Sequence, residues 1–332
     1  MNEGLIKTDI FIDCEKGMES MKYHILFDCD PGIDDAVAFA LAAAHPEILD
    51  IRGITSVAGN QTIERVTGNA LKLTSFLGME IPVARGCETP LLREIVPAGY
   101  VHGETGLGNC KLPETDRTVS CEPAPVFLYQ KLQELKNGEK MVLVPTAPLT
   151  NIALLLKTFP DAAEKIEKIV LMGGAITGGN ITSTAEFNIW EDPEAAQIVF
   201  SSGIPIVMCG LDVTCKCGFN REQIQSLLAG GEKAKAFGEM MDFYFHSEVY
   251  TDKQRIAIHD AVTFMYLLHP EIFSGQEMNV SVDCSEGVNR GMTFCDTRSW
   301  SEAPKNALVL TDADSEKFEA YLMEAILSHD RK

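Results

Sequence analysis

Basic residues are scarce in this sequence. Its 332 residues include 28 lysines and arginines against 48 aspartates and glutamates, which gives a formal net charge of −20. A surface this acidic repels polyphosphates, so a nucleic acid polymer is a poor candidate partner. A neutral small ligand or a bound cation remains compatible with this charge.

Long apolar runs are also missing. No stretch approaches the roughly 20 apolar residues that a membrane-spanning helix needs, and Met1–Ser20 lack the apolar segment of a secretory signal peptide. The ten cysteines are irregularly spaced, and the pair Cys215 and Cys217 has no second pair to complete a zinc site. We therefore expect a cytoplasmic protein without a membrane partner, whose cysteines are reduced.

Hydrophobic residues, by contrast, make up 45% of the chain, which excludes intrinsic disorder as its main state. We find no repeat, low-complexity tract or Pro/Ser-rich linker, so a single domain over residues 21–332 is expected. Residues 1–20 precede the first convincing strand. They form an N-terminal extension of unknown role, either an appendage or the product of an upstream start codon, and we assign them no function.

Short apolar runs alternate with helix-like segments along the chain. The expected strands are Tyr23–Asp28, Ile51–Val57, Met141–Pro145, Ile166–Met172 and Ile204–Leu211. The expected helices are Asp34–Ala44, Thr62–Leu77, Leu149–Phe159, Pro193–Ser202, most of Glu222–Tyr250 and, after short strands that follow Met278, Ser315–His329. Near-continuous apolar strands separated by amphipathic helices predict an α/β fold with a parallel sheet covered on both faces.

Polar residues collect where the expected strands end. The first strand runs into Asp28–Asp35, the second into Asn60, the third into Thr146 and the fourth into Gly173 and Gly174. In an open parallel sheet these ends share one edge, where ligands bind beyond the carboxyl ends of the strands. The sequence therefore predicts a polar site at this edge.

The segment Asp28–Asp35 holds four aspartates and no lysine or arginine. Carboxylates that share a site repel one another, and one would protonate near neutral pH without a compensating positive charge. A hard cation is the natural compensation; all-oxygen ligands indicate calcium or magnesium, and flexible aspartate coordination favours calcium. The alternative is that Asp34 and Asp35 only cap the following helix, which explains one aspartate better than four.

Three further clusters carry a weaker signal. The segment Asn180–Asn188 is rich in amides and hydroxyls, although an ordinary surface loop would look the same. Val101–Gly108 is a glycine-rich loop with one histidine, and no strand precedes it, so a dinucleotide-binding fingerprint is rejected. His259 and Asp260 open an apolar helix, where a structural role for the histidine is as plausible as a functional one.

In their order along the chain, these motifs resemble the nucleoside hydrolases, specifically the inosine–uridine preferring group. The resemblance covers the chain from about Lys22 to its end. It is carried by Asp28-Cys29-Asp30-Pro31-Gly32-Ile33-Asp34-Asp35, Val57-Ala58-Gly59-Asn60, Val101-His102-Gly103-Glu104-Thr105-Gly106, Val144-Pro145-Thr146, Leu171-Met172-Gly173-Gly174, Glu186-Phe187-Asn188, Asp192-Pro193-Glu194-Ala195-Ala196 and His259-Asp260.

The resemblance implies a fold, a reaction and a metal. The fold is an open mixed, mostly parallel sheet with a Rossmann-like core, in a homo-oligomer that is a dimer or a tetramer. The reaction is hydrolysis of the N-glycosidic bond of ribonucleosides, which fits a role in purine and pyrimidine salvage. The implied cofactor, Ca²⁺, would be held by Asp30, Asp35, Asp260 and the backbone carbonyl of Thr146.

The resemblance also implies roles for residues around the substrate. Asp30 accepts the proton of a metal-bound water that attacks an oxocarbenium-like ribosyl centre, and His102 and His259 lie beside the base. Asp28 belongs to the supporting shell. The ribose would be bound by Asp34, Asn60, Met172, Asn180, Glu186 and Asn188.

Two other functions compete with this interpretation. One is a haloacid-dehalogenase-type phosphohydrolase, with Asp28 of the Asp28-Cys29-Asp30 motif as nucleophile; the other is a calcium-bound nucleoside-binding protein without turnover. The motifs do not fix the base, although two histidines favour cleavage of both inosine and uridine. Trp190 either stacks on the base or packs in the core.

Overall fold

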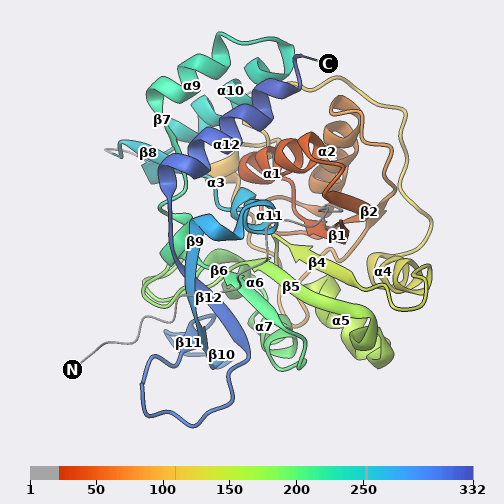
Figure 1. The fold of residues 1–332 in the computed structure, drawn as a ribbon, viewed down its shortest axis with the longest axis vertical. Helices are drawn as coiled ribbons and strands as arrows, with labels where there is room; N and C mark the ends of the chain where they lie inside the picture. The colour runs from red at the N-terminus through yellow and green to blue at the C-terminus, as the bar shows by residue number, and fades with distance from the viewer. Residues whose placement is uncertain (1–21, 109, 251–252, 332) are drawn as a thin grey trace, which may run out of the picture.

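A single mixed sheet of eight strands organises the protein (Figure 1). The computed structural model describes residues 22–108, 110–250 and 253–331. The strand order is β3-β2-β1-β4-β5-β6-β12-β9, and all neighbours are parallel except β12 and β9. The bounds are β1 Tyr23–Cys29, β2 Leu49–Ser56, β3 Val83–Arg85, β4 Met141–Pro145, β5 Ile166–Met172, β6 Ile206–Cys209, β9 Phe273–Met278 and β12 Ala307–Ala313. The predicted mixed, mostly parallel sheet is confirmed.

Helices cover both faces of this sheet (Figure 1). On β1, Ile25 and Phe27 pack into one hydrophobic core while Leu26 packs into the other, as the two-residue period of a strand requires. The first core is closed by α1 Ile33–Ala44, α10 Glu232–Phe245, α11 Ala261–Leu268 and α12 Ser315–Ser328, and the second by α4 Ala124–Gln133, α5 Thr150–Thr158 and α7 Pro193–Phe200. Strands buried on both faces explain why the apolar runs of the sequence are nearly continuous.

Several elements differ from the sequence-based expectation. The strand expected at Ile204–Leu211 is only β6, because Gly210 begins the turn into α8 Leu211–Thr214. The expected helical stretch Glu222–Tyr250 is divided into α9 Arg221–Leu228 and α10, with Gly230 and Gly231 between them. The expected helix Thr62–Leu77 is present as α2 Ile63–Phe76. The structure also contains elements that were not predicted, among them β3, β9, α4 and the short α3 Gly99–His102.

The strand order places one edge of the sheet at a topological switch point. From β1 the chain proceeds outward through β2 and β3, and from β4 it proceeds the other way through β5 and β6. Ligands of such sheets bind outside the carboxyl ends of the two central strands. Here those ends are followed by Asp30 and Thr146.

Two small antiparallel sheets lie outside the main one. The pair β7 Gly218–Asn220 and β8 Arg255–Ala257 carries the chain into His259, Asp260 and α11. The pair β10 Val280–Val282 and β11 Thr293–Cys295 lies beside β12 in Figure 1. Among the described residues, no helix has the length and apolarity needed to cross a membrane. The extension predicted at residues 1–20 lies outside the described residues.

Candidate active site

A cavity of about 340 Å³ opens beyond the carboxyl ends of the central strands. Its size is typical of a site for a small molecule. Asp30 and Asp35 are fully buried behind its wall. The other predicted site residues all line it: Asp34, Asn60, His102, Thr146, Met172, Asn180, Glu186, Asn188, His259 and Asp260. The fold thus brings together residues that are spread over more than two hundred positions of the sequence.

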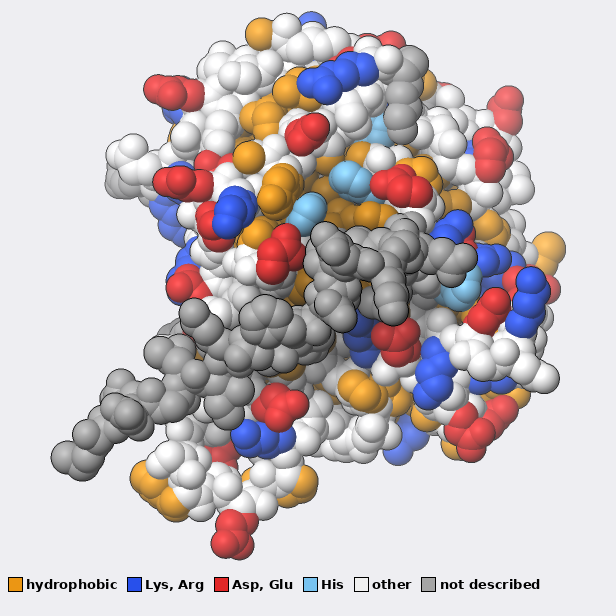
Figure 2. All heavy atoms as spheres, in the orientation of Figure 1, with side chains coloured by type: hydrophobic (Ala, Val, Ile, Leu, Met, Phe, Trp, Pro, Cys, Tyr) orange, Lys and Arg blue, Asp and Glu red, His pale blue; other side chains and the backbone are white. Residues whose placement is uncertain are grey.

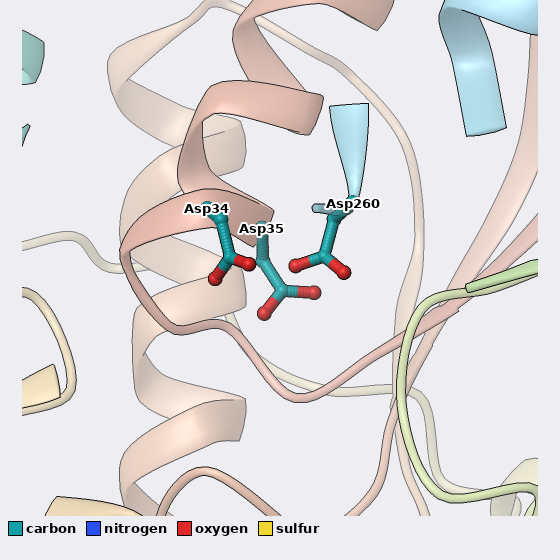
Figure 3. A group of neighbouring side chains, drawn as sticks. All are labelled: Asp34, Asp35 and Asp260. Atoms are coloured by element: carbon teal, nitrogen blue, oxygen red, sulfur yellow. The ribbon is translucent and has the colours of Figure 1, made fainter. Parts of the chain in front are cut away.

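Carboxylates form the deepest part of the site. Asp34 and Asp35 lie in the first turn of α1, and Asp260 lies at the start of α11; their carboxylates point toward the same space (Figure 3). One oxygen from each of the three lies within 4.8 Å of the others. Asp30 lies outside this group of three, but it is close enough that its negative charge contributes to raising the pKa of Asp260.

These carboxylates have no cationic partner among the described residues, because none of them forms an ion pair with a lysine, arginine or histidine. Oδ1 of Asp30 and Oδ1 of Asp34 are buried and accept no hydrogen bond within the described chain. Burial and then repulsion from Asp35 raise the pKa of Asp34 to about 7. The same two causes raise the pKa of Asp30 well above its usual value. Four buried carboxylates, two of which keep an oxygen without a partner in the described chain, fit a hard divalent cation.

Asp30 is held by the loop that follows β2. Its Oδ2 accepts a hydrogen bond of 2.6 Å from the backbone N–H of Asn60. A Cβ at Gly59 would lie 2.1 Å from this same oxygen and 2.9 Å from Cδ of Pro148. Only glycine fits there, so the glycine of the Val57–Asn60 motif allows the backbone to approach the aspartate.

Asp35 combines two roles. Its Oδ2 accepts the backbone N–H of Gly32 at 3.0 Å, which is the helix-capping contact considered as the alternative to a metal site. Its Oδ1 accepts a hydrogen bond of 2.8 Å from the hydroxyl of Thr146. The capping interpretation is therefore right for one oxygen of Asp35, and it leaves Asp30, Asp34 and Asp260 unexplained.

Asp28 supports the site from within the sheet. It lies on β1 opposite Thr55 of β2 and Pro145 of β4. Its Oδ1 accepts hydrogen bonds from the hydroxyl of Thr55 and from Nδ2 of Asn151, and the residue is 1% exposed. Because Asp28 is enclosed and does not line the cavity, it is poorly placed to be the nucleophile of a phosphohydrolase.

A network on the opposite wall positions Asn188. Glu186 caps α6 Phe187–Glu191: its Oε1 accepts the backbone N–H of Asn188 at 3.0 Å, and its Oε2 accepts that of Gly174, also at 3.0 Å. Nδ2 of Asn188 then donates to the carbonyl of Thr146 at 3.0 Å and to that of Met172 at 3.2 Å. The loop 180–188 is thus tied to the ends of β4 and β5, and is not an ordinary surface loop.

The two predicted histidines line the cavity in different settings. Nδ1 of His102 accepts the backbone N–H of Ile33 at 3.2 Å, so its ring proton is on Nε2. Nδ1 of His259 lies 2.8 Å from the hydroxyl of Thr214. Burial lowers the pKa of His102 to about 3 and that of His259 to about 4, with a smaller effect of His259 on the former and of Lys253 on the latter. Both rings are neutral at pH 7.

Trp190 lies outside this site. It is half-buried and borders a second cavity with Arg93, Glu191 and Arg290. Conversely, several residues that line the main cavity were not predicted from the sequence: Phe187, Leu211, Cys215, Tyr244, Val249, Tyr250, Lys253 and Arg255. A signal that could have indicated this wall is the pair Tyr244 and Tyr250 at the end of the expected helical stretch Glu222–Tyr250, because a tyrosine combines an apolar ring with a polar hydroxyl.

The comparisons with known proteins agree with this arrangement. The family model described as inosine-uridine preferring nucleoside hydrolase matches residues 25–320. The chain is 41% identical over 314 residues to the pyrimidine-specific ribonucleoside hydrolase RihA of Shewanella baltica, covering 93% of this chain and 98% of that protein. It is 42% identical over 315 residues to the RihA of Photobacterium profundum, covering 93% and 100%.

Solved structures show the same similarity. The plant nucleoside hydrolase PpNRh1 superposes with a TM-score of 0.85 at 32% identity, covering 92% of this chain and 99% of that one. The purine-preferring ribonucleoside hydrolase of Gardnerella vaginalis gives 0.85 at 31% identity, covering 93% and 99%. The phosphohydrolase and the non-catalytic interpretations therefore do not hold. The chain belongs to the inosine–uridine preferring nucleoside hydrolases and is an enzyme that hydrolyses the N-glycosidic bond of ribonucleosides.

Proposed function

We propose that this enzyme is a calcium-dependent hydrolase that prefers pyrimidine ribonucleosides and releases ribose and the free base. The observation that carries the metal is the buried group Asp34, Asp35 and Asp260, which has no cationic partner among the described residues. The preference for pyrimidines is supported by the similarity to pyrimidine-specific relatives, which are 41–42% identical to this chain, whereas the purine-preferring enzyme of Gardnerella is 31% identical.

The residues suited to hold the cation are Asp35 and Asp260 of this group, together with the neighbouring Asp30 and the carbonyl of Thr146, while Asp34, the third member of the group, is assigned to the ribose. All four are oxygen donors, which are the ligands that Ca²⁺ prefers. The Thr146 carbonyl already accepts Asn188 Nδ2, but a carbonyl oxygen has a second lone pair to offer. When bound, a divalent cation would lower the pKa of the attacking water and help to hold the ribose hydroxyls.

The ribose binds in the polar part of the cavity. Asp34 offers a free carboxylate oxygen, and Asn60 and Asn180 add side-chain amides. Asn188 is fixed by Glu186 and lies against Met172, with its Nδ2 3.3 Å from the sulfur. We assign the six residues Asp34, Asn60, Met172, Asn180, Glu186 and Asn188 to ribose binding, with Glu186 acting mainly by orienting the loop.

Catalysis combines proton removal from water with departure of the base. Asp30 accepts the proton of the attacking water, because its Oδ1 is free while Oδ2 is anchored to Asn60. The carboxylates favour the positive charge that develops on the ribosyl centre. Nε2 of His102 can donate a hydrogen bond to the base, and His259 lines the same cavity; as neutral rings they orient the base more than they protonate it.

A nucleoside panel tests this function. Purified enzyme is incubated with uridine, cytidine, inosine and adenosine, with and without a chelator, and free ribose is measured as reducing sugar. We expect the highest kcat/KM for uridine or cytidine and loss of activity with chelator. Faster cleavage of inosine would contradict the pyrimidine preference, and activity unaffected by chelation would contradict the metal.

We also propose that the enzyme acts in the cytoplasm as a homotetramer or dimer. All cysteines among the described residues are free, which suits a reducing compartment. Val288, Trp300 and Leu92 are 89%, 77% and 73% exposed, which makes them the first residues to test at an interface between copies of the chain. Light scattering should give two or four times the 36.4 kDa of one chain; a mass of one chain would contradict the oligomer.

A further inference from the structure

The cavity has one lysine on its wall, Lys253, at the side occupied by the aromatic rings. The ring of His102 stacks on Tyr244, with centroids 5.7 Å apart, and Tyr244 meets the edge of Tyr250 at 4.8 Å. Nζ of Lys253 lies 4.9 Å from the centroid of the Tyr250 ring. In Figure 2, histidine side chains lie among hydrophobic ones on this face, with basic and acidic side chains nearby.

The charge of Lys253 is uncommitted. No carboxylate of the described residues lies within 4.0 Å of its ammonium group, which is exposed and rests on the Tyr250 ring. Arg255 is the other basic residue of the cavity wall, but it forms an ion pair with Glu319 and donates to the carbonyl of Gly218 at 3.0 Å. Among the described residues that line the cavity, Lys253 therefore offers a positive charge that no ion pair engages.

The ribose and the base must lie at different ends of the cavity. The carboxylates and amides bind the sugar, and the base then points toward the rings of His102, Tyr244 and Tyr250. A pyrimidine that leaves carries its negative charge on N1 and on its carbonyl oxygens. His102 is a neutral ring, because burial lowers its pKa to about 3, so it supplies a hydrogen bond but no full charge.

We propose that Lys253 is a catalytic residue that acts on the leaving group: its ammonium contacts a carbonyl oxygen of the pyrimidine and stabilises the base as it departs. This inference rests on the proposed function. As the C1′–N1 bond breaks, its electron pair leaves with N1 and spreads onto the O2 oxygen, which faces the ammonium. The new bond to C1′ forms from water, whose proton passes to Asp30. The departed base takes a proton from solvent.

The mechanism predicts a dependence on the leaving group. The uracil anion is a poor leaving group, so a nearby positive charge should accelerate its departure most. The acceleration should be smaller for 5-fluorouracil, whose fluorine withdraws charge, and smallest for p-nitrophenolate, which is a good leaving group without a pyrimidine carbonyl. A charge that stabilises only the transition state changes kcat/KM in that same order.

The test compares Lys253→Met with Lys253→Arg and with the control Lys235→Met on the exposed side of α10. We expect Lys253→Met to lower kcat/KM for uridine by about tenfold or more, for 5-fluorouridine by less, and for p-nitrophenyl riboside by under about twofold. Lys253→Arg should restore most of the uridine rate, because it restores the charge, and Lys235→Met should change none of the rates.

Two outcomes would overturn the role of Lys253. Equal losses for uridine and p-nitrophenyl riboside would place its effect on the sugar or on the fold, which melting temperatures of the variants would distinguish. An unchanged uridine rate in Lys253→Met would show that the ammonium does not contact the base. Failure of the proposed function looks different, because the unmodified enzyme would then cleave inosine faster than the pyrimidine nucleosides or keep its activity with chelator.

Discussion

The backbone N–H of Asn60 donates a 2.6 Å hydrogen bond to Oδ2 of Asp30, and this contact joins the loop after β2 to the end of β1. It fixes one carboxylate oxygen and leaves Oδ1 without a partner in the described chain. A carboxylate held in this way is aimed before substrate arrives, which is what a proton acceptor for water requires.

Replacing the proton acceptor tests its role directly. We expect Asp30→Asn to keep the fold and to lower kcat for uridine by roughly 10²–10⁴-fold, because an amide cannot accept the proton of water. Asp50→Asn serves as the control, since Asp50 lies at the other end of the sheet in an ion pair with Arg52. A folded Asp30→Asn enzyme with near-normal kcat would refute the assignment.

Gly59 tests the geometry around the same oxygen. In Gly59→Ala the new methyl group would lie 2.1 Å from Oδ2 of Asp30, so the loop or the aspartate must move. A misplacement of this kind costs about 100-fold in rate. Gly68→Ala is the matched control: Gly68 lies within α2 with no atom near its Cβ, and alanine there should stabilise the helix by about 0.5–1 kcal/mol. Equal kcat for the two variants would contradict the close approach at Gly59.

The buried side chains of Asp34 and Asp35 predict how the stability of the protein depends on pH when no cation is bound. Burial, together with Asp35, raises the pKa of Asp34 to about 7, and burial raises that of Asp35 to about 6. Their unfolded-state pKa is about 4, so the folded state binds more protons between these values. The contribution of these two carboxyl groups to the free energy of unfolding is therefore greatest below about pH 4, and it is lost as the pH rises through 6 to 7.

Calorimetry can measure this loss. The melting temperature of chelator-treated enzyme should fall between pH 5 and pH 7.5 by about 2 °C or more, and Ca²⁺ should reverse the fall at pH 7.5. A melting temperature that is the same at both pH values, with and without Ca²⁺, would show that the carboxylates are compensated by other means.

His259 is expected to act on the base. His259→Ala should lower kcat for uridine by about 10²-fold and that for p-nitrophenyl riboside much less, because only the former needs help to leave. Thr214→Val removes the hydroxyl that contacts Nδ1 of His259 and should give a smaller loss with the same preference. Equal losses on both substrates would assign His259 to the neighbouring carboxylates instead.

Much of the fold was predictable because its strands are buried on both faces. Tyr23–Cys29 and Met141–Pro145 are nearly all apolar, so their type and bounds could be recognised. Strand β9, Phe273–Met278, was missed because it is an edge strand with exposed polar residues, and β3 is only three residues long. Pairing with a neighbour, and not the local sequence, makes these two segments strands.

The site was predictable where chemistry is concentrated in a short segment. Four aspartates between positions 28 and 35 cannot be explained by a helix cap alone, and Asn60 and Thr146 follow apolar strands. The wall made of Tyr244, Tyr250 and Lys253 could not be predicted in this way. Tyr244 lies at the end of α10, and Tyr250 and Lys253 follow it. The packing of α10 decides which of these side chains face the cavity, and the spacing of apolar residues along the sequence does not specify that packing.

The most direct test of the account is the rate of ribose release from uridine by enzyme stripped of divalent cations, before and after titration with Ca²⁺. We predict that stripping lowers kcat by roughly a hundredfold or more and that Ca²⁺ restores it with saturation. Asp260→Asn should need a higher Ca²⁺ concentration for half-recovery. Full activity in the stripped enzyme, confirmed by metal analysis, would contradict the proposal that the carboxylate group holds a catalytic cation.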